Sequence, residues 1–393
     1  MTVTRHAALL GAAAGLAALA AGPATADSTG VSEETIKVGV MGPFTGNASS
    51  YSKAEIGLMA FYEHVNAQGG VHGRMIEAIP EDTACDQATG IAAAKKLISQ
   101  DEVFMLHGNS CSGVALGIKP TVQEADIPWI VAHAVNQKIS SPVDPYIFHT
   151  VPTSKQMGEA MAKFALSKSE ADSIAVIAHS NEWAQGYKEP AMAYLEAQGI
   201  EPSLDLVMER GSTDATPHVL QLREEQPDFL LAILYEAETA ILLRNLEKFG
   251  LDLDIMGTLG TDLENTLARV GDMATMEGYH VLHPYVGTLD SEELAPFAEI
   301  IKTEYPDEQL TSFSFAGLGG AVAVVEALER VGPDLTREAF VEELEGLDSF
   351  ETGILAAPIS FSPENHAGAS GVAAARYVDG EATIFSSYGT PIE

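Results

Sequence analysis

Short apolar runs alternate with amphipathic stretches along most of the chain. Residues 36–41 and 75–79 are strand-like, and the segment between them, 54–66, repeats apolar side chains at helical spacing. Further strands are expected at 103–106, 127–132, 146–151, 173–178, 204–208, 229–234 and 253–256. Helices are expected at 87–97, 156–166, 187–197, 218–224 and 238–249. This alternation predicts parallel sheets with helices on both faces.

The strand–helix pattern falls into two series, one ending near residue 151 and one beginning near residue 173. We therefore expect an α/β protein with two doubly wound domains. A strong late helix is predicted at 314–331, where Gly332-Pro333 ends it. Asp379-Gly380 lies between two short apolar runs and predicts a terminal hairpin.

The first 26 residues have the pattern of a secretory signal. Arg5 precedes an apolar stretch, and Ala24-Thr25-Ala26 offers small residues for cleavage. The stretch is shorter than the roughly 20 residues that span a bilayer, which favours a signal peptide at 1–26 over an anchor. No later stretch is expected to cross a membrane. We therefore expect an exported protein that acts in the periplasm.

The chain is strongly acidic, with a formal net charge of −35. Nucleic acids and anionic membranes both favour Lys and Arg, so neither is expected as a partner. The acidic residues are spread along the whole chain, which indicates a solvated surface rather than one cation-binding patch.

Two cysteines, Cys85 and Cys111, each follow an expected strand. In an oxidising compartment such a pair favours one disulfide over two buried free thiols.

The carboxyl ends of parallel strands are where open α/β sheets bind ligands. The loops selected by that rule span residues 42–52, 107–113, 133–137, 179–186, 235–238 and 258–262. If the two domains face each other, these loops meet in one cleft.

Several of these loops match a known pattern. IKVGV at 36–40 is followed by GPFTG at 42–46, and NAQGGVHGR occupies 66–74. DTACD at 82–86 and HGNSCS at 107–112 place the cysteines, and EALER at 326–330 lies in the expected late helix. In order and spacing these segments resemble the leucine/isoleucine/valine-binding family of type I periplasmic binding proteins. The resemblance covers essentially the whole chain after residue 26.

That resemblance implies two lobes that close on a ligand around a three-strand hinge. It places lobe 1 at residues 34–153 plus 283–361, and lobe 2 at 154–282 plus 362–390. It also implies that Cys85 and Cys111 form a disulfide beside the ligand.

The resemblance assigns ligand roles to matching positions. Tyr51 corresponds to an aromatic wall residue, and Ser112 to the serine that holds a carboxylate. Ser110 lies in the same loop as Ser112. Trp183 and Tyr235 correspond to aromatic residues of the second lobe, with Trp183 as a lid.

The expected ammonium site departs from the family pattern. Ala134 matches a position whose carbonyl receives the ligand amine, but Val135 replaces a hydroxyl residue and Leu259 replaces the acidic partner. His133 is a further polar residue in this loop. An unpaired ammonium in a closed cleft is unfavourable. Another acid must therefore replace the lost one, or the ligand has no amine; the candidate acids are Glu182, Glu236 and Asp262.

The resemblance implies a solute-binding protein that delivers a small molecule to an ABC permease and ATPase. The expected ligand is a hydrophobic amino acid of branched-chain type. The alternative is a hydrophobic or aromatic carboxylate without an α-amine. More remote alternatives are a ligand-sensing receptor domain and a hydrolase. We expect no cofactor, no metal and a monomer.

An enzyme is disfavoured by the motifs themselves. The segment around Ser110 fails the G-x-S-x-G pattern, because Ser112 stands where the last glycine would be. The sequence holds no Walker loop, G-x-G-x-x-G or H-E-x-x-H motif.

Overall fold

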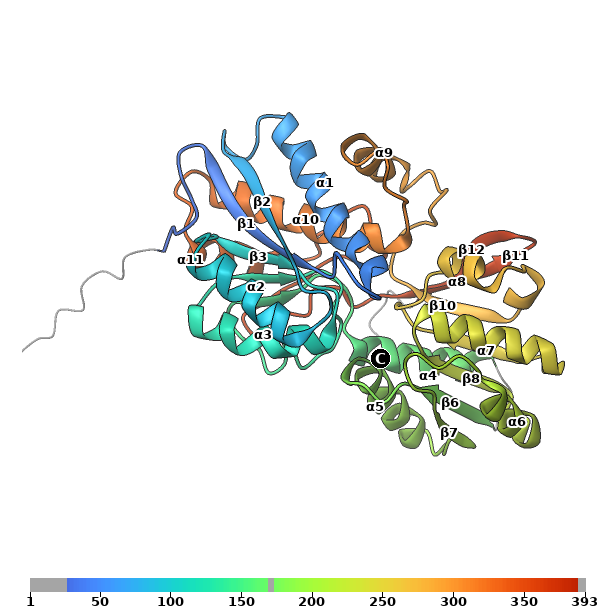
Figure 1. Cartoon of the computed structure of the whole chain (residues 1–393). Helices are drawn as coiled ribbons and strands as arrows, with labels where there is room; N and C mark the ends of the chain where they lie inside the picture. The colour runs from blue at the N-terminus through green and yellow to red at the C-terminus, as the bar shows by residue number, and fades with distance from the viewer. Residues whose placement is uncertain (1–26, 169–172, 388–393) are drawn as a thin grey trace, which may run out of the picture.

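Two separate sheets, one parallel and one mixed, organise the chain, as the computed structural model shows (Figure 1). The structure describes residues 27–168 and 173–387. The expected signal peptide at 1–26 and residues 388–390 of the expected second lobe lie outside the described residues.

The first lobe is built on a five-stranded sheet in the order β2-β1-β3-β4-β5, in which all neighbours are parallel. Its strands are β1 (Thr35–Gly42), β2 (Met75–Asp82), β3 (Met105–Gly108), β4 (Trp129–Val131) and β5 (Ile147–His149). Its helices are α1 (Lys53–Ala67), α2 (Gln87–Ser99), α3 (Ser112–Ala125), α9 (Ala295–Glu304), α10 (Ser312–Val331) and α11 (Arg337–Glu345), with a 3-10 turn η1 (Ser49–Ser52) after β1. Helices α1 and α10 pair on one side of the sheet, and α2 and α3 pair on the other.

The second lobe is built on a seven-stranded sheet in the order β12-β11-β10-β9-β8-β6-β7. Its strands are β6 (Ile174–Ala178), β7 (Leu204–Val207), β8 (Phe229–Ile233), β9 (Asp254–Gly257), β10 (Tyr279–His283), β11 (Ala373–Val378) and β12 (Glu381–Ser387). Its helices are α4 (Ser154–Lys168), α5 (Glu182–Ala197), α6 (Thr216–Glu225), α7 (Glu236–Phe249) and α8 (Leu263–Val270), with a 3-10 turn η2 (Ala274–Met276). Strands β11 and β12 form the antiparallel hairpin expected around Asp379-Gly380.

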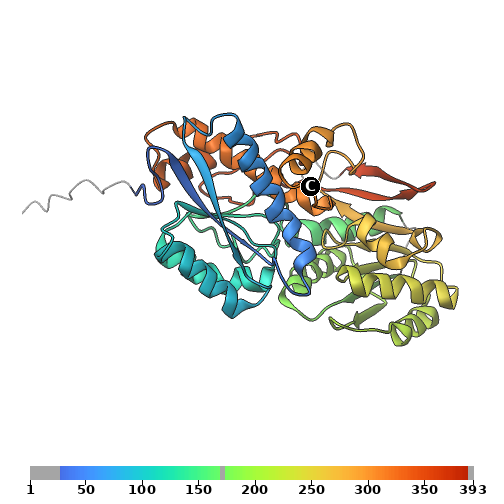
Figure 2. The ribbon, with the colours of Figure 1, turned by 45° about the horizontal axis from the view of Figure 1, so that its top comes forward.

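Both lobes repeat one strand order. The strands β7-β6-β8-β9-β10 follow the same path as β2-β1-β3-β4-β5, so each lobe has a switch point beside its first strand. In the first lobe the switch point lies between β1 and β3, and in the second between β6 and β8. Figure 2 shows the two lobes side by side in a second view. The doubly wound α/β fold predicted for both domains is thereby confirmed.

The central helix pair of the first lobe packs at very short range. Gly57 of α1 lies against the Ser314 carbonyl, and Gly317 of α10 lies against the Ala54 carbonyl, so a methyl group at either glycine would collide with backbone. Helix α10 is long and apolar enough to cross a membrane by length and composition, contrary to expectation, but 78% of its apolar window is buried in the fold. It is therefore the core helix of this lobe.

The chain passes between the lobes at three places within the described residues (Figure 1). The first crossing joins β5 to α4 and the second follows β10. Residues after the expected third crossing still pair with the first lobe, because Gly368 N donates to His149 O at 2.9 Å and His149 N donates to His366 O at 2.8 Å. We therefore place the third crossing between Gly368 and Ala373, later than the 361/362 boundary expected from the sequence.

Several elements differ from the sequence prediction, and helices α8, α9 and α11 were not predicted. Helix α5 begins at Glu182 rather than residue 187, because the Asn181 side chain caps it by accepting from Ala184 N at 3.0 Å. Strand β10 was not predicted, since His280 and His283 interrupt its apolar run.

Candidate ligand-binding site

A cavity of about 270 Å³ lies between the two switch points. It is lined by Ala48, Tyr51, Cys85, Gln87, Ser110, Cys111, Ser112, Gly113, Val114, His133, Val135, Asn181, Glu182, Trp183, Tyr187, Arg210, Tyr235 and Gly260. Both lobes contribute, from loops that follow their parallel strands. This is the position where open α/β sheets bind ligands, and the volume is that of a small organic molecule.

The loop after β3 is fixed by covalent and hydrogen bonds. Cys111 is joined to Cys85 by a disulfide, which confirms the pairing predicted from the sequence. Asn109 adopts φ +75° and accepts a hydrogen bond from Cys111 N at 3.0 Å through its side chain. The loop therefore enters α3 in a defined conformation and brings Ser110 and Ser112 to the cavity.

Ser112 opens helix α3 and faces the cavity with an unused hydroxyl. The residue is 3% exposed, and its Oγ has no hydrogen-bond partner among the residues that the structure describes. A helix N-terminus carries free N–H groups and a partial positive charge. Hydroxyl and helix together suit an anionic group of a ligand.

An aromatic cluster forms the rest of the first-lobe wall. The ring of Tyr51 lies 5.2 Å from the ring of Phe313 and 6.3 Å from that of His133. His133 is buried, and burial lowers its pKa to about 4, so the imidazole is neutral at neutral pH. Its Nε2 has no hydrogen-bond partner within residues 27–168 and 173–387. Val135 adds an apolar side chain beside it.

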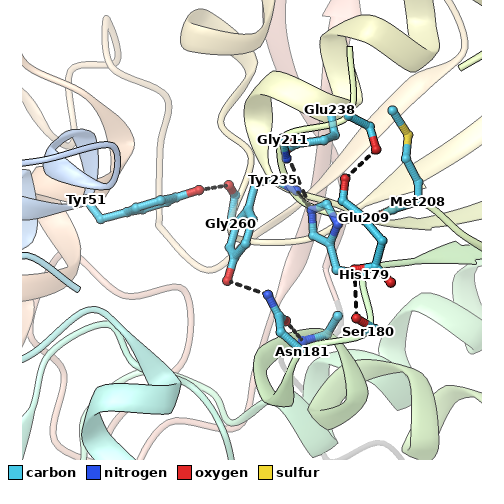
Figure 3. Close-up of polar contacts among 12 residues, drawn as sticks. Tyr51, His179, Ser180, Asn181, Met208, Glu209, Gly211, Tyr235, Glu238 and Gly260 are labelled. Carbon is cyan, nitrogen blue, oxygen red and sulfur yellow. Dashed lines mark hydrogen bonds and ion pairs between the residues drawn. The ribbon is translucent and has the colours of Figure 1, made fainter. Parts of the chain in front are cut away.

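The second-lobe wall is a stack of two aromatic rings. Trp183 of α5 and Tyr235, the residue before α7, stack at 4.3 Å between ring centroids. Asn181 donates from Nδ2 to the Tyr235 hydroxyl at 3.4 Å (Figure 3). His179 accepts from Tyr235 N at Nε2 and donates from Nδ1 to the Met208 carbonyl, which fixes its tautomer. Trp183, which was predicted to be a lid, thus stacks on Tyr235, and hydrogen bonds from Asn181 and to His179 hold Tyr235 in place.

Three residues of the first lobe reach across to the second. The Tyr51 hydroxyl donates to the Gly260 carbonyl at 3.1 Å (Figure 3), and Asn136 Nδ2 donates to the Glu182 carbonyl at 2.7 Å. Ser312 of α10 donates to Asp262 at 3.4 Å. These contacts describe a molecule in which the lobes are closed on the cavity.

Two of the nine residues proposed for the site do not line the cavity. The Ala134 carbonyl, expected to receive a ligand amine, accepts a hydrogen bond from His149 Nε2 at 2.9 Å instead. Leu259 lies with residues of β10 and α10, outside the interlobe cavity. Its neighbour Gly260 lines that cavity. The other seven are brought together: Tyr51, Ser110, Ser112, His133, Val135, Trp183 and Tyr235.

Of the three acids considered as ammonium partners, the fold brings only Glu182 to the cavity. Glu182 lines the cavity but is exposed. Asp262 caps α8 by accepting from Asn265 N at 2.7 Å, and Glu236 lies 3.5 Å from Arg269 Nε. Neither of these two lines the cavity, so no buried carboxylate does so among the described residues.

Two ionisable residues near the cavity were missed by the sequence analysis. Arg210, in the loop after β7, lines the cavity, and its guanidinium lies 5.3 Å from the Tyr235 ring centroid. Glu55 of α1 is fully buried and accepts from Ser110 Oγ at 2.8 Å. Neither position had a local sequence signal, because only the fold brings them to the switch points.

The comparison with protein families decides the assignment. The family described as periplasmic binding protein matches residues 35–382. The chain belongs to the periplasmic binding protein family. This confirms the resemblance seen in the sequence.

Individual relatives agree with the family. The leucine-, isoleucine-, valine-, threonine- and alanine-binding protein of Pseudomonas aeruginosa is 26% identical over 246 residues, which cover 62% of this chain and 66% of that protein. The match thus spans slightly less than two thirds of that relative.

Two solved structures share the fold. One is a branched-chain amino acid ABC transporter protein from Thermus thermophilus with bound valine, at TM-score 0.82 and 17% identity, covering 92% of this chain and 98% of that one. The other is the fatty acid ABC transporter substrate-binding protein from Thermomonospora curvata, at TM-score 0.80 and 21% identity, covering 93% and 95%.

Proposed function

We propose that this periplasmic binding protein is the solute-binding component of an ABC importer, and that its interlobe cavity holds a small hydrophobic carboxylic acid. The observation that carries the proposal is the cavity itself. One wall offers the unpartnered Ser112 hydroxyl at a helix N-terminus, and the other offers the stacked rings of Trp183 and Tyr235. A carboxylate at the first wall would place an apolar body against the second.

The protein would act in the periplasm, as a monomer and without a cofactor, and would deliver its ligand to a membrane permease and ATPase. Binding without turnover fits the surroundings of Ser110. Its hydroxyl contacts Glu55 at 2.8 Å and the Tyr51 carbonyl at 3.2 Å rather than a histidine base.

A hydrophobic amino acid of branched-chain type is the first ligand class. It is supported by the Pseudomonas aeruginosa relative, which is named for binding five amino acids. In this class the exposed Glu182 at the cavity edge would be the carboxylate available to the ammonium group.

A carboxylate without an α-amine is the second class, and one observation favours it. The cavity lining includes the cation Arg210 but no buried carboxylate among the described residues, and the Ala134 carbonyl already has a donor. A buried ammonium would therefore lack a partner. The structural neighbour from Thermomonospora curvata is named for a ligand of this second type.

A thermal-shift screen tests the binding role. The purified protein is unfolded and refolded to remove carried ligand, then screened with amino acids and small carboxylates. A compound at 100 times its Kd should stabilise the protein by about 2.7 kcal/mol. Failure of every hydrophobic carboxylic acid to stabilise it would contradict the proposal.

Matched pairs separate the two ligand classes. Leucine is compared with 4-methylpentanoate, and phenylalanine with 3-phenylpropanoate, by calorimetry. A site that recognises ammonium should bind the amino acid more tightly by several kcal/mol, because removal of the amine leaves its acid unpaired. A site without an ammonium partner should prefer the des-amino compound in both pairs.

A further inference from the structure

A buried acid stands directly behind the carboxylate-binding loop. Glu55 of α1 is fully buried, and its Oε1 lies 2.8 Å from the hydroxyl of Ser110, which lines the cavity. The backbone makes room for it at the switch point between β1 and β3. A methyl group on Gly42 would lie 2.7 Å from Glu55 Cγ, and one on Gly108 would lie 3.2 Å from the same atom.

The Ser110 hydroxyl has two acceptors within reach. One is Glu55 Oε1 at 2.8 Å, and the other is the Tyr51 carbonyl at 3.2 Å. An ionised carboxylate only accepts, so Ser110 must donate to it. A neutral carboxylic acid can donate to Ser110, whose own proton is then released from Glu55 and can turn to the Tyr51 carbonyl or to an anion in the cavity that Ser110 lines. The proton on Glu55 therefore sets the direction of the hydroxyl in the cavity wall.

Lys53 of α1 pairs with Glu308, and no charged side chain among the described residues affects the pKa of Glu55. On β3, burial lowers the pKa of His107 to about 3, and His133 after β4 is neutral too. Burial holds the pKa values of Tyr51 and Tyr62 well above 10, so both phenols are neutral. Residues 312–325 of α10 carry no ionisable side chain.

The remaining oxygen of Glu55 also lacks support. Its Oε2 has no hydrogen-bond partner in the described part of the chain. Burial raises the pKa of this carboxyl to about 8, against smaller opposing effects of the hydrogen bonds from Ser110 and the Asn109 backbone. Glu55 is therefore mostly neutral at neutral pH and titrates just above it.

We propose that Glu55 is a positioning residue whose proton allows the cavity to bind anions. The protonated carboxyl sets the direction of the Ser110 hydroxyl, and it places no negative charge behind the cavity wall. This inference rests on the proposed binding of a carboxylate near Ser112. A carboxylate bound there would lie next to the Ser110 loop, so an ionised Glu55 would repel it across a buried wall.

The sign of the pH effect follows from this geometry. A bound anion disfavours a second negative charge, so it raises the pKa of Glu55 further. Binding then takes up a proton at mildly alkaline pH. Anion affinity should fall by up to about tenfold per pH unit above the pKa of the free protein, until Glu55 also ionises in the complex.

Calorimetry with 4-methylpentanoate and 3-phenylpropanoate tests this coupling. The Kd of the wild type should rise about five- to tenfold between about pH 7 and about pH 9.5, and Glu55→Gln should remove most of that rise. Glu63→Gln, an exposed residue on the same helix, is the matched control and should keep the wild-type profile. A flat wild-type profile, or an unchanged rise in Glu55→Gln, would overturn the proposal.

Two measurements do not depend on Glu55→Gln folding. In wild type, the binding enthalpy near pH 8 should vary with the ionisation enthalpy of the buffer, as proton uptake requires; no variation would overturn the proposal. Infrared titration of the ligand-free wild type should show a carboxylic acid band with a separate step at about pH 8, above the steps of Glu236 and Glu264 at about 7, and the lack of a step near pH 8 would overturn it. If neither probe binds at pH 7, the proposed ligand class fails, and the infrared result alone decides the state of Glu55.

Discussion

The phenol of Tyr51 donates a hydrogen bond of 3.1 Å to the carbonyl oxygen of Gly260, which joins the two lobes directly over the cavity. The contact spans the two lobes, so it stabilises the arrangement in which they lie close together. Domain closure is a population shift toward the state with the additional contacts.

Tyr51→Phe tests this contact. The substitution keeps the aromatic wall and removes one hydrogen bond, so ligand affinity should fall by about 0.5–1.5 kcal/mol. Calorimetry measures it, and Tyr305→Phe, whose ring lies outside the cavity, is the control and should bind as the wild type does. An equal loss of ligand affinity in both variants would show that the hydrogen bond to Gly260 does not contribute to binding.

Ser112→Ala tests the anion end of the cavity. The hydroxyl is buried and without a protein partner, so we expect it to bind the ligand carboxylate. Its removal should weaken binding by roughly 1.5–3 kcal/mol, toward the lower end because the N–H groups of α3 remain. Unchanged affinity in calorimetry would reject this role.

The disulfide links the loop after β2 to the loop that carries Ser110 and Ser112. Cys85 and Cys111 are 26 residues apart, and a closed loop of this length stabilises the fold by about 3 kcal/mol in the chain-entropy account. Reduction should therefore lower the free energy of unfolding by about that amount. Thiol titration of the denatured, unreduced protein should find no free thiol; two thiols would contradict the bond.

Two buried acids, Asp262 and Glu236, make the free energy of unfolding depend on pH. Burial raises the pKa of Asp262 to about 6, and burial together with Asp262 raises the pKa of Glu236 to about 7. Both values lie above those of the unfolded chain, so the folded state holds protons more tightly. The free energy of unfolding should fall as pH rises through these values.

Asp262→Asn isolates one of these groups and keeps the cap of α8, since asparagine also caps helices. The substitution should reduce the loss of stability between about pH 5 and about pH 7.5 by about 1.4 kcal/mol. Urea unfolding at both pH values measures it, with the exposed Asp334→Asn as control. A loss in Asp262→Asn equal to that of the wild type would contradict the assignment.

The fold was predictable because buried parallel strands leave strong local signals. Runs such as Phe229–Ile233 are continuously apolar, and each is followed by an amphipathic helix. Where polar residues enter a buried strand, as His280 and His283 do in β10, the local pattern is lost. The start of α5 depended on the cap at Asn181, which apolar spacing alone does not show.

The site was predictable where a residue lies in the segment that connects a switch-point strand to the next helix, or at the first position of that helix. Tyr51, Ser112 and Tyr235 occupy such positions, and all three line the cavity. The sequence could not show whether Leu259 or Gly260 lines the cavity, because a loop has no regular periodicity that predicts which residue faces inward. Glu55 came from a helix rather than a loop, so the rule that selected the loops could not find it.

The most direct test of the account is the fluorescence of the two tryptophans. Trp183 lines the interlobe cavity, whereas Trp129 is fully buried in β4 and donates to the Gly108 carbonyl, away from the cavity lining. Stripped protein is titrated with leucine, 4-methylpentanoate, phenylalanine and 3-phenylpropanoate. The account predicts a saturable one-to-one emission change with at least one compound, kept in Trp129→Phe and lost in Trp183→Phe. A change that is kept in Trp183→Phe and lost in Trp129→Phe, or no saturable change with any compound, would contradict binding between the lobes.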